Sequence, residues 1–315
     1  MNAKPVSKKP HRWRAMSFRA FILCAALLLA TREANAWGNF GHEAIALVAW
    51  GELSPAQQAA LNAIFAGAPS IFGAKSGIDA LMFAATWPDV LREGHKHGGH
   101  LRVPLHIFAS LSAQYSDAKA VDNLHFADFD AAGETLAAPN DNVATAVNIA
   151  FGFLKNKDST PIQKGEAVAY LIHCVGDAHQ PLHAGYTADL GGNQILIQSL
   201  AGEKNLHAAW DTGFFATTPF FVRGSSPPTA FVTQVLEPLL PSVKSDALAT
   251  LNPADWVNES HALAIQYAYV DENGAKIASG ATLSGTYVAS RLAIAEKRLA
   301  EAGLRLAELF KQALP

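Results

Sequence analysis

The sequence predicts one mainly α-helical domain, and three observations support that fold class. Half of the 315 residues are apolar and only 16% are charged, as expected of a chain that buries a large core. Alanine, leucine and glycine are abundant, which suits closely packed helices. No internal repeat divides the chain, and helix-start signals recur along it. We therefore expect a single domain and not a disordered or fibrous chain.

Residues 1–36 differ from the rest and indicate a signal peptide. Basic residues precede an apolar run at 20–30, and Ala34-Asn35-Ala36 provides the small-x-small pattern of a cleavage site. The apolar run is too short to span a bilayer as a helix, although a short membrane anchor is the alternative. We predict cleavage between Ala36 and Trp37, with Met1 and Met16 both open as starts. The domain would then cover 37–315, in a secreted or periplasmic protein.

Residues 37–315 are acidic. Seven of the 24 Lys/Arg and one of the 27 Asp/Glu residues lie in 1–36, which leaves 17 basic and 26 acidic residues and a formal charge of −9. An acidic protein is poorly suited to bind nucleic acid through a broad basic surface, so any phosphate binding must be local. Cys174 is the only cysteine in this part, so no internal disulfide can form there. The histidines suggest that metal ions stabilise the fold instead.

Helix-start signals predict most of the elements in order. Ser54-Pro55 pairs an N-cap with proline at the first helical position and predicts a helix over 56–65. The polar run 140–142 precedes a helix over 143–154, and Thr160-Pro161 opens one that reaches about residue 178. Between glycine turns, 194–199 alternates like a strand and predicts a small β-hairpin.

The C-terminal part predicts one long helix after several loops. Residues 286–310 place Leu292, Leu299, Leu306 and Phe310 along one stripe, which is typical of core packing. The remaining breaks in the pattern are prolines, which predict loops between helices at Pro219, Pro227-Pro228, Pro238 and Pro241.

The densest group of metal-binding side chains is His173-x-x-x-Asp177-x-x-x-x-x-His183. Residues four apart on a helix project from one face, so His173 and Asp177 can reach a common ion. Pro181 ends that helix and frees His183 to turn toward a neighbouring ion. His207 and Asp211 repeat the four-residue spacing. One such pair alone would indicate a surface hydrogen bond, but two pairs of imidazole and carboxylate favour zinc.

In their order along the chain, these motifs resemble the S1/P1 nucleases, which are zinc-dependent single-strand nucleases and 3′-nucleotidases. The resemblance implies a mainly helical fold shared with bacterial zinc phospholipase C, with a small β-hairpin. Four further segments carry it: Trp37 with His42 five residues on, Trp87-Pro88-Asp89 with Arg92, Leu105-His106, and more loosely Trp256-x-x-Glu259-Ser260.

The resemblance implies three zinc ions per chain. The ligands that it implies for the first are Asp89, His106, His173 and Asp177. For the second they are the amine and carbonyl of Trp37, His42 and the shared Asp177. For the third they are His183, His207 and Asp211. Two roles in catalysis also follow from the resemblance: Asp89 would orient the nucleophile, and Arg92 would contact phosphate.

The resemblance implies single-stranded DNA, RNA and 3′-nucleotides as substrates, with 5′-phosphate products. Some fungal members follow the Leu-His motif with an aromatic residue that stacks on the base and, two residues further on, an acid that contacts it. Here Ile107 and Ala109 take those places, which leaves base preference open and makes Phe108 the expected substrate contact.

Other histidines are expected to lie outside the site. A solvated loop is the simplest interpretation of the glycine-rich stretch at 95–100, although it could bind metal. His179 should point off the ligand face, and His125 has no partner pattern. His261 is expected to support the helix that contains Trp256.

Two alternative functions stay open on the sequence alone. Zinc phospholipase C shares the His173-to-His183 spacing. However, the gap from Trp37 to His42, the 23 residues between His183 and His207, and an aspartate at 211 favour the nuclease. The other alternative is a noncatalytic secreted zinc-binding protein. Whether the protein is a nuclease or a noncatalytic zinc-binding protein, we expect a monomer without stable membrane association.

Overall fold

The structure, a computed structural model, describes residues 37–96, 105–109, 122–130, 136, 142–224 and 228–315. The predicted signal peptide lies outside the described residues, as do His97 and His100. The described residues belong to one compact unit. Within them, no helix combines the length and the apolar composition that a bilayer crossing requires.

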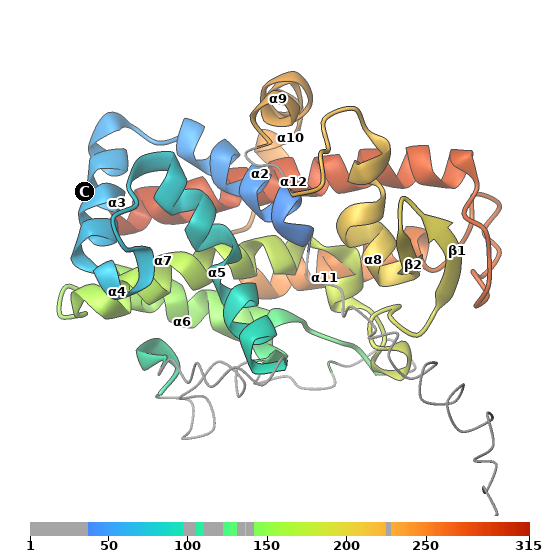
Figure 1. Cartoon of the computed structure of the whole chain (residues 1–315), viewed down its shortest axis with the longest axis horizontal. Coiled ribbons are helices and arrows are strands. Elements are labelled where there is room, and N and C mark those ends of the chain that lie inside the picture. The colour runs from blue at the N-terminus through green and yellow to red at the C-terminus, as the bar shows by residue number, and fades with distance from the viewer. Residues whose placement is uncertain (1–36, 97–104, 110–121, 131–135, 137–141, 225–227) are drawn as a thin grey trace, which may run out of the picture. The chain divides into compact units, whose positions relative to one another are not determined.

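The prediction of a mainly helical fold with a small hairpin is confirmed (Figure 1). The longer helices are α2 (Gly38–Gly51), α3 (Pro55–Gly67), α5 (Gly77–Lys96), α6 (Val143–Lys155), α7 (Pro161–His179), α10 (Glu237–Ala247), α11 (Pro253–Leu263) and α12 (Gly285–Ala313). The short helical segments include α4 (Pro69–Phe72), η2 (His106–Phe108), η4 (Asp122–His125), η5 (Pro181–Ala184), η6 (Thr187–Asp189), α8 (Leu206–Ala208), the π-helical η7 (Ala209–Gly213), η8 (Phe215–Thr217), α9 (Thr229–Phe231), and the π-helical η9 (Val232–Leu236) and η10 (Ala264–Ala268).

The predicted helix starts coincide with capped helix starts. Ser54 and Thr160 each form a capping box with the glutamine three residues on, and proline follows each cap. The side chain of Asn142 accepts two backbone N–H bonds at the start of α6. These local bonds explain why short sequence patterns predicted α3, α6 and α7 within a few residues.

Helix α7 lies at the centre of the helical packing. It packs against α2, α5, α6, α11 and α12, and Figure 1 shows α6 and α7 running side by side. Every residue from Gly165 to His179 is buried, so α7 has no solvent face along that stretch. Polar side chains on its C-terminal half, among them His173 and Asp177, therefore lie inside the core.

The C-terminal part agrees with the sequence analysis except at two prolines, and Pro227 lies outside the described residues. In α12, Leu299, Leu306 and Phe310 are fully buried as expected. Pro238 and Pro241 lie inside α10, so the loop prediction is wrong there. Helix α10 follows directly on the π-helical η9, so both prolines lie inside a continuous helical stretch over 229–247.

The hairpin consists of β1 (Leu196–Leu200) and β2 (Glu203–Asn205), which pair antiparallel. Ala201 and Gly202 form its turn with positive φ angles of 50° and 102°. The predicted strand at 194–199 is thus confirmed with a shift toward the C-terminus. Strand β2 leads directly into α8, which carries His207.

Candidate metal centre

Three groups of buried histidine and aspartate side chains meet at the C-terminal half of α7. In each group, one possible ligand atom per residue lies within 4.8 Å of the others. The groups are His42–His173–Asp177, Asp89–His125–His173 and His183–His207–Asp211. The first two share His173, and His183 Nδ1 of the third lies 3.8 Å from Asp177 Oδ1, so the groups form a connected centre and not three isolated sites.

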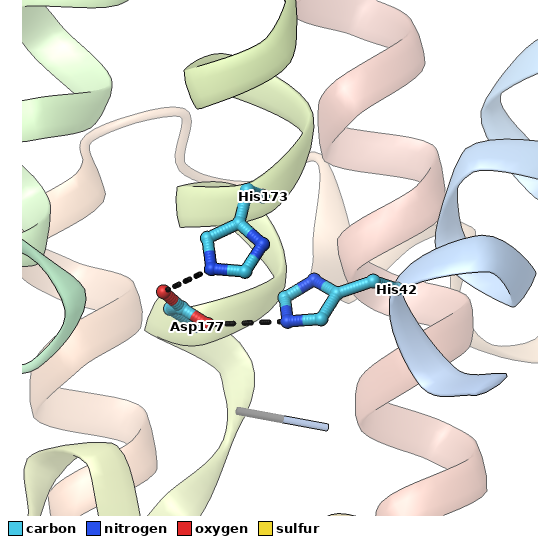
Figure 2. Close-up of side chains that lie close together, drawn as sticks. All are labelled: His42, His173 and Asp177. Atoms are coloured by element: carbon cyan, nitrogen blue, oxygen red, sulfur yellow. Dashed lines mark ion pairs between the residues drawn. The ribbon is translucent and has the colours of Figure 1, made fainter. Parts of the chain in front are cut away.

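Asp177 lies between several histidines. Its Oδ1 atom is 3.4 Å from His42 Nε2, and its Oδ2 atom is 3.1 Å from His125 Nδ1 and 3.3 Å from His173 Nε2. Figure 2 shows His42 reaching from α2 toward Asp177, which lies one turn after His173 on α7. Burial alone would raise the pKa of Asp177, but the charge of His173 and the hydrogen bond from His125 hold that pKa well below its usual value. Asp177 is therefore a carboxylate available to more than one group.

The approach of α2 to α7 depends on Gly176. A Cβ atom at this position would lie 2.7 Å from His42 Nδ1, so a larger residue would displace the ring. The His42 ring stacks on His173 with 4.0 Å between centroids. Next to them, the buried Trp37 donates its indole N–H to the Gly176 carbonyl over 2.8 Å. The first described residue is thus held against the centre.

Backbone carbonyls orient three of the histidine rings. A carbonyl oxygen only accepts, so the Nδ1 atom bonded to it carries a proton, and Nε2 is the nitrogen left to bind a metal ion or a second proton. This hydrogen bond joins His173 to the Ala85 carbonyl (2.9 Å), His183 to that of His125 (2.7 Å), and His207 to that of Gly191 (2.6 Å). Rings held in this tautomer present Nε2 to a metal ion.

Several buried polar atoms of the centre have no hydrogen-bond partner among the described residues. They are both ring nitrogens of His42, both oxygens of Asp89, Asp177 Oδ1, His183 Nε2 and Asp211 Oδ2. A buried polar atom without a partner costs about 1–3 kcal/mol, so a convergent set needs compensation. Imidazole nitrogen and carboxylate oxygen are the ligands that zinc accepts, and the residues therefore fit zinc.

The protonation states agree with a site for cations. Burial lowers the pKa of His183 to about 3 and that of His207 to about 4, so both rings are neutral near pH 7. Burial also raises the pKa of Asp211 well above its usual value, which a nearby cation would reverse. At His173 burial is outweighed by Asp177 and Asp89, which raise the pKa to about 9. Near pH 7 the His173 ring is therefore protonated, and its Nε2 proton faces the two carboxylates, where a metal ion could bind instead.

His106 does not join Asp89 and His173, which corrects the sequence-based placement. Its Nδ1 atom is 2.8 Å from Glu166 Oε1, and the side chain is 47% exposed. His125 takes the expected position, with Nδ1 3.0 Å from His173 Nε2 and 4.0 Å from Asp89 Oδ1. Both histidines follow a leucine, so the Leu-His pattern alone could not separate them.

The expected substrate contact at Phe108 is also wrong. Phe108 is fully buried and packs edge-on against Tyr170, with ring centroids 4.8 Å apart, so its ring cannot stack on a base. After His125, by contrast, the chain has an aromatic residue at Phe126 and an acid at Asp128, both partly exposed. Burial and the nearby Asp189 raise the pKa of Asp128 to about 7. Phe126 and Asp128 are the sequence signal that could have identified His125.

Arg92 lies near the centre on α5, three residues after Asp89. Its Nε atom is 3.7 Å from Asp122 Oδ1, and its side chain is 13% exposed. Burial, and less strongly the charge of Arg92, lowers the pKa of both His125 and His183. The positive charge of Arg92 therefore acts on the centre, where it would favour a bound anion.

Two other histidines have structural partners. His179 donates from Nδ1 to the Val175 carbonyl and accepts at Nε2 from Arg305, so it points away from the centre as expected. His261 donates to the Ala184 carbonyl and stacks on Phe129.

The chain is similar to known proteins over the whole of its described part. The model of the S1/P1 Nuclease family matches residues 37–315. Endonuclease 3 of Arabidopsis thaliana is 38% identical over 150 residues, which are 45% of this chain and 49% of that protein, so the alignment spans about half of it. Endonuclease 2 of the same plant is 27% identical over 91% of this chain and 93% of its own length. Nuclease S1 of Aspergillus oryzae is 24% identical over 92% and 96%, respectively.

Proposed function

Because the chain belongs to the S1/P1 nuclease family, we propose that it is a zinc-dependent phosphodiesterase that cleaves single-stranded DNA and RNA and dephosphorylates 3′-nucleotides. The observation that supports this proposal most strongly is the centre of three buried His/Asp groups around α7. Its aspartate and histidine side chains lie within the part of the chain that the family model matches.

The proposed ligand sets follow the family pattern with one replacement. The first set is Asp89, His125, His173 and Asp177, with His125 in the place expected for His106. The second is His42, Asp177 and the amine and carbonyl of Trp37. The third is His183, His207 and Asp211. The first and third sets are supported by the measured separations, and the second by His42, whose two ring nitrogens have no hydrogen-bond partner among the described residues.

Zinc ions bound in these sets would supply positive charge for the phosphoryl oxygens and lower the pKa of a bound water. The residues of the chain would orient the attacking water, bind the phosphate and hold the ions at a fixed spacing. Asp89 has two buried oxygens without a hydrogen-bond partner among the described residues, so it can bind and also orient the attacking water. Arg92 would donate charge-assisted hydrogen bonds to the phosphate. Asp177 would fix the spacing of two sets, because its two oxygens face different histidines.

Substrate recognition would be local because residues 37–315 are acidic overall. A single strand can bend its backbone toward a buried centre and offer an unpaired base for stacking, whereas a duplex cannot. The family pattern of aromatic residue and acid after Leu-His now falls on Phe126 and Asp128. We propose that these two residues contact the base and that 5′-phosphate products are released.

One substrate panel tests the proposal. The protein beginning at Trp37 would be offered single-stranded DNA, RNA, 3′-AMP and phosphatidylcholine, before and after zinc removal by a chelator. We expect turnover of the first three substrates, its loss on chelation and its recovery with zinc. Turnover of the lipid alone would indicate a phospholipase C. No turnover by a fully zinc-loaded protein would indicate a noncatalytic zinc-binding protein.

We also propose that residues 1–36 are removed before function, which gives a secreted or periplasmic monomer. A protein that keeps Ala36 is expected to bind one zinc ion fewer and to lose roughly nine tenths or more of its activity. The reason is that Trp37 would then offer a peptide nitrogen, which has no lone pair for a metal. Elemental analysis of zinc per chain measures this, with a protein extended after Pro315 as the control. Full zinc loading with Ala36 in place would contradict the role of the Trp37 amine.

A further inference from the structure

Gln180 connects two of the three groups although it belongs to none of them. It is fully buried and directly follows α7. Its backbone N–H donates to the Asp177 carbonyl over 3.1 Å, and its own carbonyl accepts from the His183 N–H over 3.0 Å. Its side chain extends toward Asp211. One residue thus contacts segments that carry members of two different groups.

The amide of Gln180 can have only one orientation. Its Oε1 atom is 2.5 Å from the backbone nitrogen of Leu182, which can only donate. The Nε2 atom must therefore face the other way, where it donates to Asp211 Oδ1 over 2.5 Å. The bond to Leu182 fixes the donor that Asp211 meets.

This donor determines which oxygen of Asp211 is left for a metal ion. Oδ1 is occupied by Gln180, whereas Oδ2 has no hydrogen-bond partner among the described residues. Oδ2 lies 3.3 Å from His207 Nε2, and the His207 ring is 4.9 Å from that of His183. Asp211 is on the π-helical turn η7, so its direction is not set by regular α-helical geometry.

We propose that Gln180 is a positioning residue that holds Asp211 with Oδ2 toward His183 and His207, and so sets the zinc affinity of that group. The inference rests on the proposed zinc site. Hydrogen bonds to metal-binding carboxylates generally act in this way, and their loss lowers metal affinity about 10- to 100-fold.

Two substitutions of Gln180 test the role of its Nε2 donor in different ways. Gln180→Glu keeps the shape and the bond from Leu182 but turns a carboxylate oxygen toward Asp211. Gln180→Met removes the donor without adding charge. We expect one of the three zinc affinities to fall about 10- to 100-fold in Gln180→Glu and about tenfold in Gln180→Met. Circular dichroism of the metal-free proteins identifies any variant that fails to fold, and the other variant then decides the outcome.

Gln312→Glu is the matched control. Gln312 makes the same kind of amide-to-carboxylate bond, 3.3 Å to Glu308 Oε1, but on the exposed surface of α12. Competition with a chromophoric chelator measures the affinities, and thermal unfolding with and without zinc shows where stability changes. A positioning role predicts that the variants differ from wild type mainly in the rise of Tm caused by zinc. A purely structural role predicts an equal loss in the metal-free protein.

The outcomes distinguish this inference from the proposed nuclease function. Wild-type zinc affinity in both Gln180 variants would overturn the positioning role, whatever the enzyme cleaves. A wild-type protein that binds three zinc ions but cleaves no substrate would refute the nuclease and leave the role of Gln180 intact.

Discussion

Asp177→Asn is expected to lower kcat/KM for single-stranded DNA about a thousandfold or more. Asparagine keeps the shape of the side chain but removes the negative charge that faces His42, His125 and His173. A metal ion contributes several kcal/mol to a phosphoryl-transfer transition state, and each 1.36 kcal/mol is a factor of ten in rate. Since Asp177 belongs to two of the proposed ligand sets, its loss would affect both.

The control for this substitution is Asp79→Asn, which removes the same charge from the exposed first turn of α5. It should keep full activity and full zinc content. Kinetics on single-stranded DNA and elemental analysis of zinc provide the two measurements. An Asp177→Asn protein with three bound zinc ions and wild-type kcat/KM would refute the central position of this carboxylate.

His125→Ala and His106→Ala test the corrected ligand assignment directly. We expect His125→Ala to lose a zinc ligand and at least about a hundredfold in kcat/KM. His106→Ala should change kcat/KM only a few-fold, because the backbone N–H groups of His106 and Ile107 still bond to Glu166. Zinc content and kcat/KM of both variants, measured at saturating zinc, separate the two assignments. A large loss in His106→Ala with a near-normal His125→Ala would restore the original placement.

The helices could be predicted because their signals are local. A cap residue followed by a proline was sufficient to predict α3 and α7, and the structure adds the glutamine that completes each capping box. The position of Pro241 within α10 was not predictable in this way, since proline usually ends a helical pattern. Local signals therefore predicted where helices begin better than where they continue.

Members of the proposed ligand sets could be predicted to lie together only where both belong to one continuous helical segment. His173 with Asp177, and His207 with Asp211, are four residues apart and contact each other as expected. The choice between His106 and His125 depends on how η2 and η4 pack on α7, and in the sequence only Phe126 and Asp128 after His125 pointed to it.

Partners from distant segments could not be predicted either. The Gly191 carbonyl that orients His207 and the Gln180 amide that holds Asp211 are 16 and 31 residues away from their partners. Nothing in the residue type of a glycine carbonyl or a glutamine indicates such a contact. Only the folded chain shows which backbone atoms lie behind each ring.

The burial of the centre has a kinetic consequence. His42, His173 and Asp177 have no exposed surface, and they lie between α2 and α7 inside the core. These side chains cannot move away from a bound ion until part of the helical frame opens, and such local openings are infrequent in well-packed regions. Release of bound zinc should therefore proceed at the opening rate of the helices, and raising the chelator concentration beyond a threshold should not accelerate it.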